Sequence, residues 1–146
     1  MKKSILLGLM AACTLFCAAS CSKSADDEPE SNDGRITYTN VKISETSDAI
    51  TLTYTMKTGG ESVEVKQEWK FSGQECTSAV MTETFSSEKT AKDAYNALKE
   101  EYGSNVSISG KKVTVDMTED YKGFTREIIA GVAAGMKQSL ENGIGA

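Results

Sequence analysis

Residues 49–71 form a stretch that reads AITLTYTMKTGGESVEVKQEWKF and contains the clearest structural pattern of the chain. Apolar side chains alternate with threonines in its first half and mainly with charged residues in its second half. This is the period-two pattern of strands with one buried face. Gly59 and Gly60, between the halves, supply the backbone freedom that a tight turn requires. The stretch predicts an antiparallel hairpin, with Gln67 as the one polar residue at a buried position.

The flanking segments extend this hairpin into a larger sheet. Residues 35–43 also alternate, but the apolar parity changes between Tyr38 and Val41. A change of parity within one strand indicates an extra residue, so we expect a bulge or bend near Asn40. Residues 76–85 form a fourth expected strand with a less regular pattern.

A helix is expected after the fourth strand, before the chain returns to strands. Ser86 or Ser87 caps its start and Gly103 ends it. Its expected inward positions recur every three or four residues, at Ala91, Ala94, Tyr95, Leu98 and Tyr102. Two short strands follow, joined by a turn at residues 109–111 and carrying Val106, Ile108, Val113, Val115 and Met117.

The last helix is expected over about residues 125–141, with an earlier turn near Tyr121. Gly131 and Gly135 have the spacing of a close-packing helix face, and each costs about 1 kcal/mol of helix propensity relative to alanine. We therefore expect them to allow close approach to the sheet or to another helix, with self-association as the alternative. The expected buried stripe is Phe124, Ile128, Val132, Met136 and Leu140.

The order of elements, β-β-β-β-α-β-β-α, predicts an α+β fold. We expect one domain over residues 35–146, with about six strands in a mainly antiparallel sheet and two helices packed on one face. Tyr38, Tyr54, Trp69 and Phe71 lie at inward positions. We therefore expect them in the core rather than on a platform for a sugar ring.

Composition and charge exclude several classes of function. The 146 residues include 16 Lys and Arg against 21 Asp and Glu, a net charge of −5, and no histidine. An acidic surface repels phosphate backbones, so no nucleic-acid partner is expected. The missing histidine removes the commonest general base and the commonest metal ligand.

The acidic residues do not form a recognisable site either. Asp116, Glu119 and Asp120 fit charge placement at a helix start, because their spacing is not that of a calcium loop. We predict no catalytic, cofactor-binding or metal-binding residue and therefore no enzyme. A carboxylate-based enzyme is the less favoured alternative.

The first 20 residues have the pattern of a secretory signal peptide. Lys2 and Lys3 give a positive start, and a largely apolar run follows from residue 5 to residue 19. The run is short for a membrane span and ends on small residues. We therefore expect residues 1–20 to be removed.

Residues 18–21, Ala-Ala-Ser-Cys, resemble the lipobox of bacterial lipoproteins. In that family cleavage occurs before the cysteine, which then carries acyl chains. The resemblance implies lipidation at Cys21, although Ala18 stands where the family usually has leucine. Cys13 and Cys17 fit less well, because one follows a very short apolar run and the other follows bulky residues. Ordinary cleavage near the same position, giving a soluble secreted protein, is the alternative.

Residues 21–34 follow as an expected disordered tether, with little to bury and a run of acids at Asp26, Asp27, Glu28, Glu30 and Asp33. An acidic tract after the lipidated cysteine resembles the surface-export signal of Bacteroidetes lipoproteins. The resemblance implies a lipid anchor in the outer membrane and display on the cell surface. A solvated linker facing the periplasm is the alternative.

Cys76 is the remaining cysteine, because Cys13 and Cys17 leave with the signal peptide and Cys21 is expected to be lipidated. A lone cysteine cannot form an intramolecular disulfide. We expect Cys76 to be buried and the domain to be a monomer.

Taken together, the sequence predicts a small envelope lipoprotein that is a non-enzymatic binding or accessory module. The expected partners are the membrane, through the anchor, and an unidentified protein or glycan. A structural or host-facing surface protein is the alternative.

Overall fold

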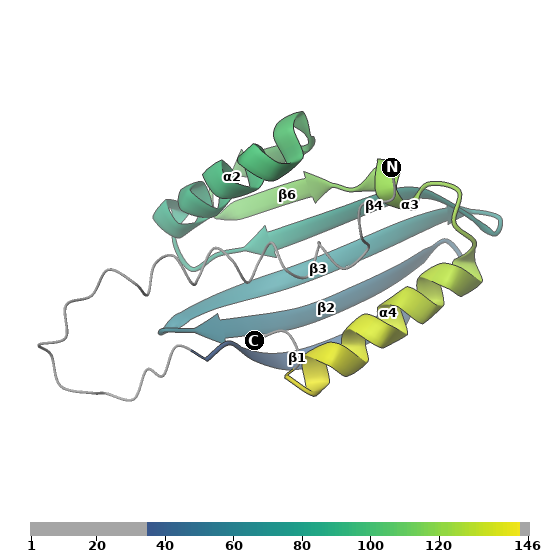
Figure 1. Cartoon of the computed structure of the whole chain (residues 1–146), viewed down its shortest axis with the longest axis horizontal. Helices are drawn as coiled ribbons and strands as arrows, with labels where there is room; N and C mark the ends of the chain where they lie inside the picture. The colour runs from purple at the N-terminus through teal and green to yellow at the C-terminus, as the bar shows by residue number, and fades with distance from the viewer. Residues whose placement is uncertain (1–34, 144–146) are drawn as a thin grey trace, which may run out of the picture.

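The predicted hairpin is formed by β2 (Ala49–Thr58) and β3 (Glu61–Ser72). The computed structural model describes residues 35–143, so the expected signal peptide, Cys21 and the acidic tether lie outside the described residues. Figure 1 shows the two strands side by side. Ile50 pairs with Trp69 and Met56 with Val63, so the apolar side chains of both strands share one face.

The first strand, β1 (Thr37–Glu45), pairs antiparallel with β2 and contains the predicted bulge. The register shifts between Thr39 and Lys42, and Asn40 has a left-handed φ of 56°. The bulge restores inward parity to Ile43, which pairs with Leu52. Thus the parity change in the sequence predicted this irregularity.

The remaining strands are β4 (Glu75–Thr84), β5 (Val106–Ser109) and β6 (Lys112–Asp116). All pairings are antiparallel, and the strand order is β1-β2-β3-β4-β6-β5. The short hairpin of β5 and β6 therefore joins the sheet beside β4, with β5 at one edge and β1 at the other.

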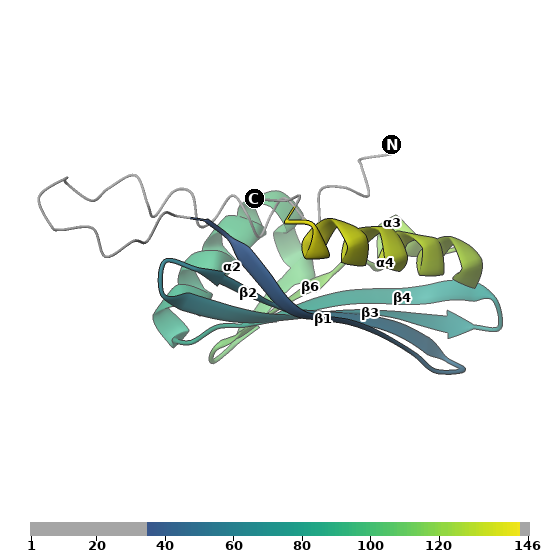
Figure 2. The same cartoon turned by 90° about the horizontal axis from the view of Figure 1, so that it is seen from below.

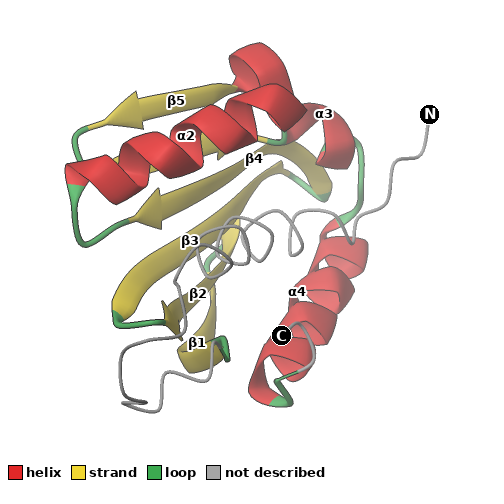
Figure 3. Ribbon diagram, turned by 60° about the vertical axis from the view of Figure 1, so that its left-hand side comes forward, coloured by secondary structure: helices red, strands yellow, loops and turns green. Residues whose placement is uncertain are grey.

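Both long helices, α2 (Glu88–Tyr102) and α4 (Arg126–Glu141), lie on one face of the sheet (Figure 2). Helix α2 packs on β5 and β6, and α4 packs mainly on β1 and β2. A 3₁₀ turn (Gly103–Asn105) follows α2, and the four-residue α3 (Thr118–Tyr121) packs on β4. This arrangement confirms the predicted α+β fold, with helices on one face of a six-stranded sheet (Figure 3).

The start of α4 is fixed to the sheet by Arg126. Its guanidinium donates hydrogen bonds to the carbonyl oxygens of Thr46 (2.6 Å) and Ser47 (3.1 Å) and lies 3.5 Å from a carboxylate oxygen of Glu45. The same group stacks over the ring of Phe71, at 5.1 Å from the ring centre. These contacts place the helix against the turn between β1 and β2.

The core lies between the sheet and these helices. Trp69 is fully buried and meets Tyr121 of α3 edge to face, with ring centres 5.8 Å apart. Tyr54 and Phe71 are also buried, and Tyr38 packs on the core, so the prediction that these aromatic residues are core residues is confirmed. Cys76 is buried, as expected.

The buried stripe predicted for the last helix is wrong at Ile128 and holds at its other positions: Leu140 is buried, and Phe124, Val132 and Met136 are partly buried against the core. Ile128 is 50% exposed, whereas Ile129, Ala133 and Leu140 are buried. A step of one residue turns a helix by 100°, and the contacts of Arg126 fix the rotation of α4 at its first turn. The sequence pattern alone did not contain that tertiary contact.

The expectation that Gly131 and Gly135 mediate close packing is also wrong. Both glycines are exposed on α4, and a Cβ atom added at either position would have no neighbouring atom within 4 Å. Neither has a positive φ. Nothing in the described part of the chain therefore requires glycine at these positions.

We predict that Gly131→Ala and Gly135→Ala each stabilise the domain by roughly 0.5–1 kcal/mol, because alanine has the higher helix propensity and restricts the unfolded chain. Chemical denaturation of each variant measures the change. Ala134→Gly, at an exposed position of the same helix, is the reverse control and should destabilise. Destabilisation by the glycine-to-alanine changes would contradict the exposed placement.

Candidate functional site

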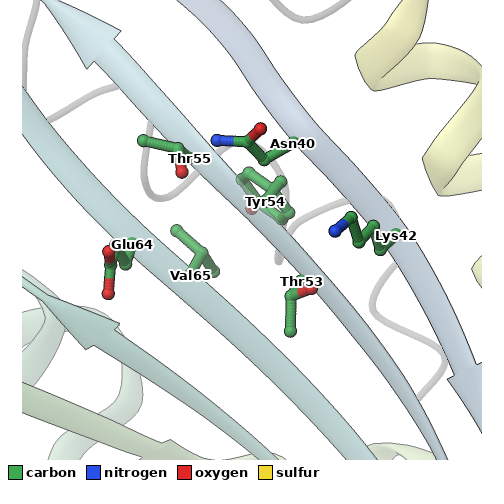
Figure 4. Close-up of a pocket in the computed structure, with 7 residues that line it drawn as sticks. All are labelled: Asn40, Lys42, Thr53, Tyr54, Thr55, Glu64 and Val65. Carbon is green, nitrogen blue, oxygen red and sulfur yellow. The ribbon is translucent and has the colours of Figure 1, made fainter.

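The sheet face that points away from the helices carries the first candidate site. Thr53, Thr55 and Glu64 alternate with buried residues of β2 and β3, so their side chains project from this open face. A pocket of about 260 Å³ lies here, lined by Asn40, Lys42, Thr53, Tyr54, Thr55, Glu64 and Val65 (Figure 4). We call it the bulge pocket, because the bulge of β1 forms one side.

The bulge determines which side chains border the bulge pocket. Asn40 is the only non-glycine residue with positive φ among residues 35–143. A left-handed conformation costs an L-residue roughly 1–2 kcal/mol, least for asparagine and aspartate, and bulges re-aim side chains. Figure 4 shows the Asn40 amide beside Thr55 and the Lys42 side chain on the Thr53 side of the pocket.

The charged side chains of the bulge pocket form no ion pairs with described residues, unlike two lysines elsewhere on the same face of the sheet. Lys66 and Lys70 lie 3.2 Å and 3.6 Å from oxygens of Glu68. Lys42 and Glu64, in contrast, form no ion pair with any described residue. A cation and a carboxylate are therefore both available to a ligand in the bulge pocket.

The neutral groups of the bulge pocket are equally available. The side chains of Asn40, Thr53 and Thr55 make no hydrogen bond to other described residues. Together the pocket offers an amide, two hydroxyls, an ammonium and a carboxylate. This set can donate and accept several hydrogen bonds, but it contains no activated nucleophile with an adjacent base.

The second candidate lies on the helix-covered face, at Glu83 of β4. Its side chain is 2% exposed, with Val65 and Val113 as its cross-strand neighbours. Its Oε1 atom has no hydrogen-bond partner, and burial raises the pKa of this carboxyl to about 7. An isolated buried carboxyl destabilises a fold when it ionises.

Other polar groups lie on the same face as Glu83. Gln67 hydrogen-bonds the hydroxyl of Tyr121, while the indole Nε1 of Trp69 is buried without a partner. Burial, with smaller contributions from nearby charges that include Glu83, raises the pKa of Tyr102 to about 12. The sequence pattern predicted Gln67 at an inward position and missed Glu83.

The signal for Glu83 was nevertheless present in the sequence. Met81, Glu83 and Phe85 share the parity of Ala79, and all four are buried. The register shift between Lys70 and Phe71 disturbs the start of the β3–β4 pairing, which made this strand look irregular.

The other residues considered from sequence have structural roles. The Cys76 thiol donates to the carbonyl oxygen of Ser78 (3.5 Å), and burial raises its pKa. Asp116 accepts a hydrogen bond from the backbone N–H of Thr118 (2.9 Å), and hydrogen bonding to Thr118 lowers the pKa of Asp116. Asp116 thus stabilises the start of α3, as its position predicted. Within residues 35–143, no cluster of three histidine, cysteine or acidic residues could hold a metal ion.

Two further observations bear on identity. None of the helices in the described range is both long enough and apolar enough to span a membrane. Comparison with protein-family models, curated proteins and solved structures finds no match to this chain. The candidate sites therefore rest on the residues themselves.

We predict that Glu83 makes stability depend on pH. Burial holds the pKa of Glu83 at about 7 in the folded state, above the ordinary value of 4.5, so the folded state binds the proton more tightly. The contribution of protonated Glu83 to the free energy of unfolding is fully present below pH 4.5. It falls by roughly 3 kcal/mol as the pH rises to 7. Denaturation of the parent and of Glu83→Gln across this range measures the loss, which the variant should lack.

Glu100→Gln, at an exposed position of α2, is the matched control and should keep the pH profile of the parent. Equal profiles for Glu83→Gln and the parent would mean that water reaches the Glu83 carboxyl in solution, contrary to its buried placement.

Proposed function

We propose that this protein is a small envelope lipoprotein, anchored in the outer membrane through Cys21, whose domain is a non-enzymatic binding module. The observation that carries the binding role is the bulge pocket, where five polar side chains converge without bonding to one another. The anchor rests on the lipobox-like residues 18–21.

The chemistry of the described residues supports binding rather than catalysis. General acid–base catalysis by carboxylates requires two groups whose environments separate their pKa values. Glu83 is a single buried carboxyl, and Glu64 lies on the opposite face of the sheet. The chain has no histidine to act as a base beside a serine or threonine hydroxyl.

The open face is a suitable place for a ligand or partner. Both long helices lie on the other side of the sheet, so one polar face is left without a covering element in the described chain (Figure 2). The domain core does not depend on that face. A ligand can therefore bind there without any rearrangement of the core.

We predict that Cys21→Ala moves the protein from the membrane fraction to the soluble fraction, because the thioether anchor is lost. Fractionation of the native host, with metabolic labelling by a fatty acid, measures this change. Cys76→Ala is the control and should leave both readouts unchanged. Continued acylation and membrane association of the Cys21 variant would contradict the assignment.

We further predict that the acidic tract directs surface display. Replacement of Asp26, Asp27, Glu28 and Glu30 by alanine should protect the protein from protease added to intact cells, whereas the parent is cleaved. Lipidation should be equal in both. If the parent and the variant are cleaved equally, the acidic tract acts only as a spacer. If both are protected, the protein faces the periplasm.

A further inference from the structure

The bulge pocket has the properties of a site for one small, strongly hydrogen-bonding ligand residue. Its volume of about 260 Å³ is below the range of roughly 300–1,000 Å³ that holds drug-sized ligands. Glu64 and Lys42 provide opposite charges, and Thr53, Thr55 and Asn40 provide neutral donors and acceptors. An apolar ligand would displace water from these groups without replacing the hydrogen bonds of that water.

The cross-strand register fixes how these groups are ordered. Lys42 pairs with Thr53, and Thr55 pairs with Glu64, so the ammonium and the carboxylate belong to adjacent rows of the sheet. The hydroxyls of β2 lie on the strand between β1 and β3. A ligand that reaches both charges must therefore cross the two threonines.

This order matches a hydroxylated ligand that carries one negative charge. The ammonium of Lys42 can pair with a ligand carboxylate, which is a charge-assisted hydrogen bond. The carboxylate of Glu64 accepts hydrogen bonds only, so it suits ligand hydroxyls. Thr53, Thr55 and Asn40 can bond to further hydroxyls or ring oxygens.

We propose that the bulge pocket binds a carboxylate-bearing sugar residue, such as a uronic acid within a glycan, with Lys42 on the carboxylate and Glu64 on the hydroxyls. This inference rests on the proposed binding function and names its ligand class. We choose an acidic glycan as the ligand because a neutral glycan would leave the ammonium of Lys42 without an opposite charge, while the hydroxyls between Lys42 and Glu64 suit a ligand that carries several hydroxyls.

The unusual conformation of Asn40 supports this assignment. It is a non-glycine residue in a left-handed conformation, at a bulge that borders the pocket. Glycine would adopt that φ with less strain but would remove the amide from the pocket. Asn40→Gly therefore separates the recognition role of this side chain from its backbone role.

The test uses the chain without its signal, residues 21–146 with Cys21→Ser, and galacturonic acid tetramers as the probe. Nuclear magnetic resonance titration of backbone amides should show shifts concentrated in β1, β2 and β3 around the bulge pocket. Lys42→Gln should weaken binding roughly tenfold or more, which is the loss expected for one charge-assisted hydrogen bond. Asn40→Gly should weaken binding without lowering stability.

Two controls decide between recognition and general charge attraction. Lys70→Gln removes the same charge from the same face, away from the pocket lining, and should change the affinity less than about twofold. Methyl-esterified tetramers, which have lost the charge, should bind as weakly as the acid binds to Lys42→Gln. The inference would be overturned by shifts elsewhere in the domain, by equal effects of Lys42→Gln and Lys70→Gln, or by equal binding of the ester.

Failure of this titration is distinguishable from failure of the proposed function. The experiment takes place in solution and does not depend on the anchor or on export. If Cys21 carries the lipid and the acid tetramer does not bind at the bulge pocket, the glycan assignment is wrong while the lipoprotein proposal stands.

Discussion

The alternation of apolar and polar side chains along β2 and β3 is the constraint on which the rest of the structure depends. Because successive residues of a strand point to opposite faces, this hairpin assigns one face to the core and the other to water. Trp69 and Leu52 lie on the core face of the sheet and are fully buried beneath the helices. Thr53 and Glu64 are left on the open face, where the candidate pocket forms. Core and candidate site are therefore two consequences of one pattern.

The edge strand adds a local exception to this alternation. A strand that kept strict alternation through Tyr38 and Ile43 would turn one of them outward. The bulge at Asn40 keeps both packed against the core, at the cost of one left-handed residue. The same bulge interrupts the exposed edge of the sheet, which discourages pairing with other strands. It also brings Asn40 and Lys42 to the pocket, so one irregularity serves the packing of the core and shapes the proposed binding site.

The sequence predicted the parts of the molecule that local pattern controls. The β2–β3 hairpin, the bulge at Asn40 and the Ser87 cap of α2 followed from parity, glycine placement and capping chemistry. The rotation of α4 did not, because Arg126 fixes it through contacts with residues about 80 positions away. The exposure of Gly131 and Gly135 follows from that rotation.

The candidate sites were less predictable than the fold. Glu83 was detectable from its parity with Met81, but its missing hydrogen-bond partner is a tertiary property. The bulge pocket combines residues from three strands, and only the pairing register brings Lys42 and Glu64 to neighbouring rows. Sequence spacing alone therefore indicated a polar face without indicating where on that face a ligand would fit.

We propose that the open face, with the bulge pocket, is presented to the outside of the cell, while the helices cover the opposite face of the sheet (Figure 2). Labelling of Thr53→Cys by a membrane-impermeant maleimide on intact native cells tests it most directly, with buried Cys76 in the parent as the unreactive reference. We predict rapid labelling of the variant before lysis and none of the parent. Labelling of the variant only after lysis, or no labelling of the purified folded variant, would contradict it.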